Sequence, residues 1–316
     1  MMTRVVALSG GVGGAKLALG LSDLVKGESL AIISNTADDF EHLGLLICPD
    51  IDTQLYTLSG KANSDQGWGL ADESWRVMDA LEALGGETWF RLGDMDLATH
   101  LWRRGAMAGG ATLTDATRGL RRALNIQCDV LPMSNDPVRT IIQCEEGELP
   151  FQHYFVRRRC EPAVRGVVFA GADCARPSDE ALAALASPEL EAIIICPSNP
   201  FVSIDPILHV GAYRRCFASS PAPVIAVSPI VGGRAIKGPA AKMMAELGFP
   251  VSPVTIARRY SDFIDCLVID EADAESAPAV RALGVEAAVT RTVMTSRDDK
   301  RRLAQFVMDL AKGGDE

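Results

Sequence analysis

The sequence predicts a doubly wound α/β fold, in which helices cover both faces of a mostly parallel, Rossmann-like sheet. Apolar runs end in turn residues at 4–9 (RVVALS) and 29–34 (SLAIIS), and a glycine-rich turn and a helical pattern lie between them. Further apolar runs alternate with helical patterns in the second half of the chain. A strand–helix–strand unit has parallel strands, and its repetition along the chain is typical of this fold class.

The elements of the predicted core follow in order. After the strands within 4–9 and 29–34, apolar runs at 191–200, 222–233, 265–271 and 285–294 predict four more buried strands. Helical periodicity appears at 178–187, 238–248 and 296–312. These segments predict the remaining strands of the sheet and the helices that cover it.

The middle of the chain has a different pattern. Residues 72–85 and 97–109 have helical periodicity, and Thr114 is expected to cap a further helix. The runs 139–144 and 151–156 flank EEGELP and predict an antiparallel hairpin. We therefore interpret 1–316 as a single α/β domain, with a core of 1–60 and 166–316. The insertion at 61–165 is expected to be largely helical, to carry the hairpin and to cover one end of the sheet.

Composition excludes several classes of protein. The chain of 316 residues has a formal net charge of −10 and no lysine- or arginine-rich block, which argues against a nucleic-acid partner. No apolar run reaches the roughly 18 residues of a membrane span. The eight cysteines form no C-x-x-C motif, and we expect small buried side chains in a reducing compartment. A cytoplasmic location and a homodimer are the corresponding expectations.

The glycine-rich turn SGGVGGAK, residues 9–16, predicts a phosphate site. It is not a P-loop, because Lys16 is followed by Leu17, and Lys16 also replaces the third glycine of a dinucleotide fingerprint. Gly11, Gly13 and Gly14 allow backbone amides to approach an anion at a helix N-terminus, and Lys16 adds a full charge. The alternative is that these glycines serve only a tight turn.

Four carboxylates follow the second predicted strand: Asp38, Asp39, Asp50 and Asp52. Placed near a phosphate, they would repel one another unless a cation or a basic group joins them. Carboxylates together with substrate phosphates are ligands that Mg²⁺ prefers, so all four are candidate metal ligands. The alternative is that individual members cap helices or turns.

Two other segments carry polar candidates. Ser198 and Asn199 follow a late strand and are expected to bind the same phosphates. RLGDMDLATH, residues 91–100, contains Arg91 and His100, and we interpret His100 as a structural residue rather than an acid or base. The tryptophans at 68, 75, 89 and 102 are expected to fill a small core rather than to stack on a ligand. No nucleophile–base motif is present, which favours phosphoryl-type chemistry by positioning and charge neutralisation.

The motifs together resemble one family. SGGVGGAK, NTADD, CPDIDTQLYTLSG, GWG, RLGDMDLATH, LTDAT, LPMSNDPV, PSNP, SPIVGG and KGPAAKMM occur in this order between residues 9 and 244, and VMTS follows at 293–296. This series is similar to that of the 2-phospho-L-lactate transferase family of coenzyme F-420 biosynthesis. The likeness extends over essentially the whole chain.

The resemblance implies a transferase reaction. A phospho-acid joined through a diphosphate to guanosine is the donor, and 7,8-didemethyl-8-hydroxy-5-deazariboflavin is the acceptor. The terminal ribityl hydroxyl attacks the phosphorus that carries the acid, and GMP leaves. The acid itself stays open between phospholactate, phosphoenolpyruvate and phosphoglycerate.

The resemblance also implies roles for particular residues. Asp52 and Arg91 match acceptor-binding positions, and Asp38 and Asp52 match acidic positions linked to metal and catalysis. Asn135 stands where members often carry aspartate, and the segment between Asp39 and Asp50 departs from the usual spacing. The alternative functions are an oxidoreductase and a non-catalytic nucleotide-sugar-binding regulator of the gluconeogenesis-factor type.

Overall fold

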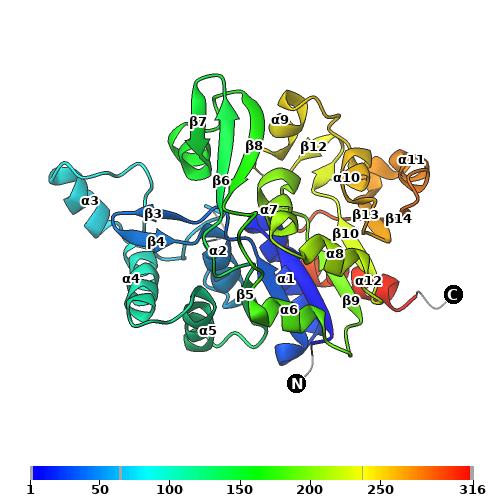
Figure 1. Ribbon diagram of the computed structural model, residues 1–316, viewed down its shortest axis with the longest axis horizontal. Coiled ribbons are helices and arrows are strands. Elements are labelled where there is room, and N and C mark those ends of the chain that lie inside the picture. The colour runs from blue at the N-terminus through cyan, green and yellow to red at the C-terminus, as the bar shows by residue number, and fades with distance from the viewer. Residues whose placement is uncertain (1–2, 64–65, 237, 314–316) are drawn as a thin grey trace.

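The computed structural model describes residues 3–63, 66–236 and 238–313, and a parallel sheet of seven strands lies at its centre (Figure 1). The sheet has the order β14-β13-β10-β9-β1-β2-β5, and each neighbouring pair is parallel. Its strands are β1 (Val5–Ser9), β2 (Leu30–Ser34), β5 (Asp129–Pro132), β9 (Ala192–Ile195), β10 (Val224–Val227), β13 (Cys266–Asp270) and β14 (Glu286–Thr290). The predicted doubly wound fold is confirmed.

The strand order reverses at β1. From β1 the chain continues outward through β2 to β5, and β9, β10, β13 and β14 then extend the sheet on the other side of β1. The crevice beyond the carboxyl ends of β1 and β9 is therefore the topological switch point, where α/β proteins bind ligands.

Alternate residues of the strands face two helical layers, because successive side chains of a strand point to opposite faces. Val5 and Ala7 of β1 belong to one core and Val6 and Leu8 to the other. The first core contains α1 (Gly11–Leu24), α2 (Pro49–Leu58), α5 (Leu113–Ala123) and α12 (Arg297–Ala311). The second contains α6 (Asp179–Leu185), α7 (Asp205–His209), α8 (Tyr213–Ala218), α9 (Ala240–Glu246), α10 (Pro253–Tyr260) and α11 (Ala277–Arg281).

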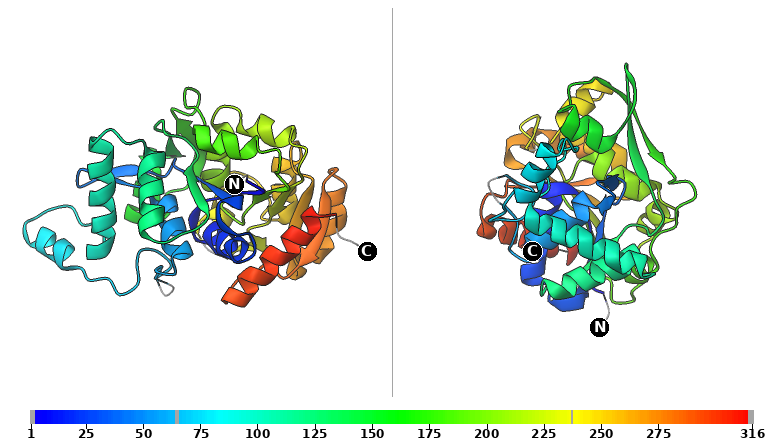
Figure 2. Two further views of the ribbon diagram at one scale, coloured as in Figure 1. Left: turned by 90° about the horizontal axis from the view of Figure 1, so that it is seen from below. Right: turned by 90° about the vertical axis from the view of Figure 1, so that its left-hand side faces the viewer.

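A smaller third core lies at one end of the molecule (Figures 1 and 2). It is formed by the β3–β4 hairpin (Phe40–His42 and Leu45–Ile47), α3 (Arg76–Ala83) and α4 (Asp94–Ala108). The helices predicted within 72–85 and 97–109 are confirmed. The hairpin occupies the segment between Asp39 and Asp50 whose spacing departs from the family pattern.

One strand comes from the middle of the predicted insertion. Strand β5 pairs with β2 and forms an edge of the central sheet. The range 61–165 therefore contributes to the main sheet as well as to the outer elements, and its description as a separate subdomain stays a prediction.

The predicted hairpin exists, but the prediction of its second strand at 151–156 is wrong. Strand β6 (Arg139–Cys144) pairs with β7 (Gly147–Pro150) and with β8 (Val164–Ala170) in an antiparallel sheet. Residues 151–156 are helical rather than extended. The chain already reverses at Glu145 and Glu146, and Phe151 and Tyr154 then bury their rings at helical spacing.

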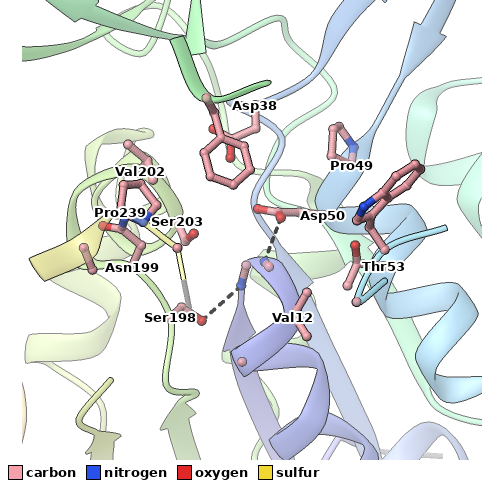
Figure 3. A pocket seen from close by; sticks show the side chains of 18 of the residues that line it. Val12, Asp38, Pro49, Asp50, Thr53, Ser198, Asn199, Val202, Ser203 and Pro239 are labelled. Carbon is pink, nitrogen blue, oxygen red and sulfur yellow. Dashed lines mark hydrogen bonds between the residues drawn. The ribbon is translucent and has the colours of Figure 1, made fainter. Parts of the chain in front are cut away.

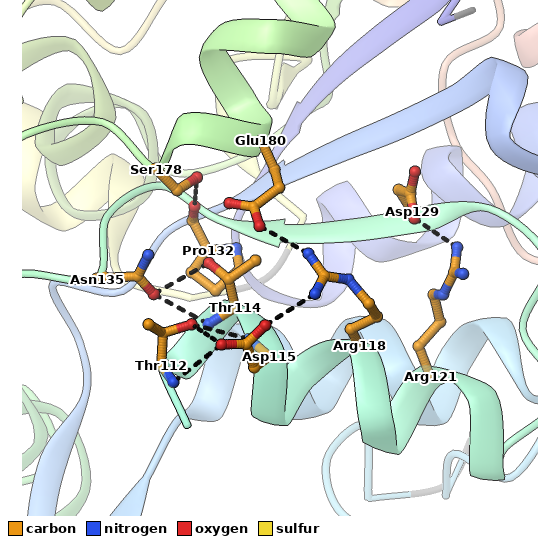
Figure 4. Close-up of polar contacts among 10 residues, drawn as sticks. All are labelled: Thr112, Thr114, Asp115, Arg118, Arg121, Asp129, Pro132, Asn135, Ser178 and Glu180. Carbon is orange, nitrogen blue, oxygen red and sulfur yellow. Dashed lines mark hydrogen bonds and ion pairs between the residues drawn. The ribbon is translucent and has the colours of Figure 1, made fainter. Parts of the chain in front are cut away.

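Thr114 is not the cap of α5. The Thr112 hydroxyl accepts a hydrogen bond from the Asp115 amide at 3.1 Å and forms a capping box with it (Figure 4). The Thr114 amide and hydroxyl instead donate to Oδ1 of Asn135 at 2.9 and 3.0 Å. Asn135 thus ties α5 to the chain after β5 through an acceptor oxygen, which asparagine and aspartate both possess.

Helices α1 and α12 approach each other closely at Gly20. A Cβ atom at this buried position would lie 2.2 Å from the Lys300 carbonyl oxygen. Any side chain at residue 20 would therefore force α1 and α12 apart.

Within the described residues, no helix combines the length and the apolar composition needed to cross a membrane.

We expect Gly20→Ala to lower the thermal unfolding midpoint, because α1 and α12 must separate to accommodate the methyl group. The control is Gly105→Ala in α4, where nothing lies within 4 Å of the added Cβ. That change should instead stabilise by up to about 1 kcal/mol, since alanine is the better helix former. Equal effects of the two substitutions would contradict this description of the interface.

Candidate functional site

A cavity of about 600 Å³ opens at the switch point of the sheet. Such a volume is in the usual range for small-molecule sites. The glycine turn after β1, the first turn of α2 and the segment after β9 form its polar end (Figure 3). Aromatic side chains form another part of its wall: Trp68, Trp89, Phe90, Phe151 and Phe155.

The N-terminus of α1 meets the first turn of α2 in this cavity. Gly11 has φ of 63°, a conformation that favours glycine, and its amide donates to Oδ1 of Asp50 at 2.7 Å. The Gly10 amide donates to the Ser198 hydroxyl at 3.3 Å. Both contacts are drawn in Figure 3. Asp50 therefore takes the position of an N-cap side chain for α1, which has none of its own.

Gly13 and Gly14 permit a close approach of α1 to its neighbours. A Cβ at Gly13 would lie 2.4 Å from the Pro197 carbonyl oxygen, and one at Gly14 would lie 2.3 Å from the Ser9 hydroxyl. Gly13 lines the cavity, whereas Gly14 is buried against Ser9 and Ser198. Gly14 is therefore required for close packing, whereas Gly11 and Gly13 expose their backbone to the cavity.

The other expected phosphate ligands also line the cavity. Lys16 donates from Nζ to the Met294 carbonyl at 2.9 Å and so connects α1 to the segment before α12. Ser198 presents its hydroxyl beside Gly10. Asn199 accepts a hydrogen bond from the Phe201 amide at 3.0 Å, which orients its side chain at the cavity wall.

Asp38 and Asp50 both line the cavity, and neither has an ordinary pKa. Burial and the nearby Asp50 charge raise the pKa of Asp38 well above its usual value. Burial raises the pKa of Asp50 to about 6, although hydrogen bonds from Asn35 and from the Gly11 amide lower it in part. The Asn35 amide donates to Oδ2 of Asp50 at 2.9 Å. The two carboxyl groups thus share one part of the site and interact electrostatically.

Asp39 and Asp52 are buried but are not among the described residues that line the cavity. Burial raises the pKa of Asp39 to about 8. Asp52 forms an ion pair with Arg103 of α4, whose side chain is fully buried. The four aspartates therefore divide into a pair in the cavity and a pair behind it. In the described part of the chain, no three His, Cys, Asp or Glu side chains converge as a metal site.

Arg103 is a residue of this region that the sequence motifs do not indicate. The carboxylate cluster predicted either a cation or a basic group, and Arg103 is that basic group for Asp52. His100 lies between the two buried acids, with Nδ1 3.7 Å from Asp52 and Nε2 3.4 Å from Asp96. Its burial outside the cavity agrees with a structural role. The available signal was the spacing of His100 and Arg103, which places both on one face of α4.

Arg91 lies at the exposed edge of the cavity. Its guanidinium is 4.9 Å from the ring centre of Trp75 and 3.4 Å from Asp79. The core interpretation of the tryptophans is wrong for Trp68, which is 45% exposed and lines the cavity, and for Trp102, which is 46% exposed. Trp89 also lines the cavity, so two of the four tryptophans are available to a flat ligand.

The fold and the site together define a class of protein. A cavity at the switch point of an α/β sheet, lined by a glycine turn, two carboxylates and aromatic rings, is a typical small-molecule site of this fold class. The family model described as "2-phospho-L-lactate transferase CofD" matches residues 5–303. The chain belongs to this family and is a transferase.

Individual relatives agree with this assignment. A phosphoenolpyruvate transferase of Kitasatospora aureofaciens is 38% identical over 98% of this chain and 98% of its own length. A 2-phospho-L-lactate transferase of Methanosarcina mazei is 38% identical, with coverage of 96% and 99%. A crystal structure of a UPF0052 family member from Bacillus halodurans covers 98% of this chain and 99% of its own, with a TM-score of 0.63 and 16% identity. That last likeness confirms the fold.

The buried Asn35 amide suggests a direct test of the carboxylate pair. We expect Asn35→Asp to cost roughly 3 kcal/mol or more, because it replaces a donor to Asp50 by an unpaired buried charge. The repulsion needs both carboxyls to be ionised, and Asp50 ionises only above about pH 6. Asn35→Asp should therefore lower the unfolding midpoint more at pH 8 than at pH 5.

The matched control is Asn135→Asp, at an exposed position where the side chain acts only as an acceptor for Thr114. It should leave the midpoint nearly unchanged at both values of pH. An Asn35→Asp variant with the same stability as the control would show that Asp50 does not depend on this amide.

Proposed function

We propose that the protein transfers a phospho-acid group, phospholactate or phosphoenolpyruvate, in coenzyme F-420 biosynthesis. The donor is the guanosine diphosphate derivative of the acid, and the acceptor is the ribityl hydroxyl of 7,8-didemethyl-8-hydroxy-5-deazariboflavin. The new bond joins the ribityl oxygen to the phosphorus that carries the acid, the diphosphate bond breaks, and GMP leaves. The observation that supports this best is the division of one cavity into a polar end and an aromatic wall.

The polar end suits a diphosphate. Gly11 and Gly13 bring the N-terminus of α1 to the cavity, and the partial positive charge of that terminus favours an anion. The Ser198 and Asn199 side chains border the same space, and Lys16 adds a cationic group at its edge. These groups hold the donor by its phosphates, and the leaving GMP keeps the same contacts.

The aromatic wall suits a flat tricyclic acceptor. Trp89 and Phe90 precede α4, and their rings are 5.7 Å apart at a steep angle. Phe151 and Phe155 also line the cavity, and their rings stack at 5.4 Å. Rings of this kind bury a planar ligand by offset or edge contacts. Arg91 at the exposed edge can then hold an acceptor oxygen by paired donors.

Two residues fit a divalent cation. Asp38 and Asp50 offer carboxylate oxygens in the cavity, and one of the buried Asp38 oxygens has no hydrogen-bond partner among the described atoms. Mg²⁺ commonly binds through one or two carboxylates plus substrate phosphates. Bound there, it would neutralise charge on the diphosphate and the leaving group. Asp39 and Asp52, which were expected in the same metal site, lie behind the cavity wall.

This chain's own contribution is to fix these groups before the substrates arrive. Asn35 and the Gly11 amide hold Asp50 at both carboxylate oxygens. Thr53, one turn further along α2, lines the same cavity. Such preorganisation is the main catalytic resource in phosphoryl-type transfer, where little covalent chemistry falls to the protein.

Family membership favours this proposal over the two alternatives. An oxidoreductase and a non-catalytic nucleotide-sugar regulator would each bind a nucleotide on a similar fold. Incubation with guanylylated phospholactate, phosphoenolpyruvate and phosphoglycerate in turn, with deazaflavin as acceptor, separates the three functions. GMP release coupled to acceptor consumption supports the transferase, and the preferred donor identifies the acid. Binding without turnover of any donor would contradict the proposal.

We expect transfer to require Mg²⁺ or Mn²⁺ and to stop when a chelator is added. Asp50→Asn keeps the shape of the side chain but removes an anionic ligand, so it should lower kcat by about 100-fold or more. GMP release measured against metal concentration checks both statements. Undiminished activity in chelator, or an Asp50→Asn variant with nearly wild-type kcat, would show that Asp50 acts only as a helix cap.

We expect Arg91→Lys to lower kcat/KM for the acceptor by about tenfold, because an ammonium cannot reproduce the paired donors of a guanidinium. The control is Arg122→Lys, at an exposed position of α5. Steady-state kinetics with the acceptor varied measure both variants. If lysine serves as well as arginine at residue 91, that side chain acts only as a counter-charge.

A further inference from the structure

Helix α9, which packs beside β8, borders the cavity with one of its faces (Figure 1). Pro239 and Ala240 at its N-terminus line the cavity. Met243, one turn further along, is fully buried in the core, and the Asn199 side-chain amide contacts its sulfur at 3.7 Å. This face of α9 therefore belongs to the polar end of the cavity, which we assign to the donor.

Lys242 lies on a different face of α9 and is bound by three oxygen atoms. Its Nζ donates to Oε2 of Glu246 at 2.8 Å, to the Pro162 carbonyl at 2.9 Å and to the Tyr154 hydroxyl at 3.4 Å. An ammonium group has three N–H donors, so these acceptors can use all of them. The same Glu246 oxygen accepts from the Val164 amide at 2.9 Å. One lysine–glutamate pair thus connects α9 to the chain between Tyr154 and Val164.

The segment that Lys242 holds also forms part of the cavity wall. Phe151 and Phe155 line the cavity with stacked rings, and Tyr154 lies on the same short helical turn. The Tyr154 ring is fully buried, and its centre is 5.7 Å from the Lys242 ammonium, within the range of a cation–π contact. Residues three and four apart are neighbours on a helical turn, so a shift of Tyr154 also moves the two phenylalanine rings.

We infer that Lys242 is a positioning residue for the acceptor, because it holds the turn 151–157 against α9 and so fixes the stacked phenylalanine rings. This inference rests on the proposed function and deepens it. Lys242 is not among the described residues that line the cavity, so it acts through the turn rather than on a substrate. The segment KGPAAKMM then has two roles, since it borders the donor with one face and holds the acceptor wall with another.

The acceptors of Lys242 make it more than a surface ion pair. A partly exposed pair at i, i+4 spacing contributes little by itself. Pro162, however, is a buried residue, and loss of the ammonium takes a donor away from its carbonyl. A buried carbonyl without a donor carries a desolvation cost, which the chain can relieve by moving toward water. The turn 151–157 would move with it.

We expect Lys242→Met, which keeps the apolar stem and removes the donors, to raise the acceptor KM about fivefold with kcat changed less than about twofold. The ring wall lies away from the reacting atoms and binds the acceptor equally in the ground and transition states, so its loss appears in KM. The donor KM should change less than about twofold, because Met243 still anchors α9 in the core. Lys242→Arg keeps the charge and the donors and should recover most of the acceptor KM.

The matched control is Arg118→Met. The Arg118 side chain is 35% exposed, against 34% for Lys242, and it joins α5 to Glu180 of α6 at 2.6 Å (Figure 4). Neither Arg118 nor Glu180 is among the described lining residues of the cavity. The control should lower the unfolding midpoint without changing the acceptor KM. An equal rise of the acceptor KM in the control, or equal KM values for Lys242→Met and Lys242→Arg, would overturn the inference.

A measurement without substrate separates this inference from the proposed function. We expect amide hydrogen exchange at 151–157 to rise in Lys242→Met and to stay unchanged in Arg118→Met, because exchange reports local opening. If the wild-type protein transfers no phospho-acid group, the proposed function fails, whereas the exchange pattern still tests whether Lys242 holds the turn. Unchanged exchange at 151–157 in Lys242→Met would refute the positioning role. If that variant does not fold, Tyr154→Phe replaces it, since it removes one acceptor and keeps the ring, and its exchange must rise at 151–157 for the inference to stand.

Discussion

The constraint on which the rest of the site depends is the burial of four carboxylates between residues 38 and 52. Buried charges must be paired, hydrogen-bonded or neutralised by a proton. The structure uses different means for each. Arg103 pairs with Asp52, amide donors hold Asp50, and the raised pKa values of Asp38 and Asp39 favour their neutral forms. The position of α4 follows from this requirement, because Arg103 must reach the interior from outside the sheet.

The polar end of the cavity arises where two helix N-termini converge. Helix α1 begins directly after β1, and α2 begins after the β3–β4 hairpin with Asp50 and Asp52 in its first turn. Acidic residues are favoured at such termini, so Asp50 stabilises both helices through its place between them. A phosphate that enters the cavity meets a terminus whose Gly11 amide is already engaged. A phosphate bound there would therefore need an additional positive charge, from Lys16 or from a cation.

The aromatic wall shows how outer elements complete a site that the sheet only begins. Trp68, Trp89 and Phe90 come from loops around α3 and α4, and Phe151 and Phe155 come from the turn after β7. Phe90 packs on the small third core, whereas Phe151 belongs to the core on one face of the main sheet. Trp89 and Phe90 directly precede α4, so their placement depends on the contacts of that helix, which also carries Arg103 of the buried ion pair.

Much of this protein was determined by local sequence. Apolar runs at 4–9, 29–34, 191–200, 222–233, 265–271 and 285–294 each became a strand of the sheet. The interior strands among them are buried on both faces and must therefore be apolar throughout, whereas β14, at the edge, is only partly buried. The sequence also indicated several residues of the cavity, because the carboxyl ends of parallel strands meet at one edge of a sheet. These are the glycine turn, Asp38, Asp50, Ser198 and Asn199. Tertiary structure alone decided which aspartates face the cavity and which are paired behind it. That choice depends on Arg103, which is 51 residues from Asp52 along the chain, and on the packing of α4 against α2. Local periodicity carries no information about such a contact, because the energy of an ion pair depends on where two distant segments come together.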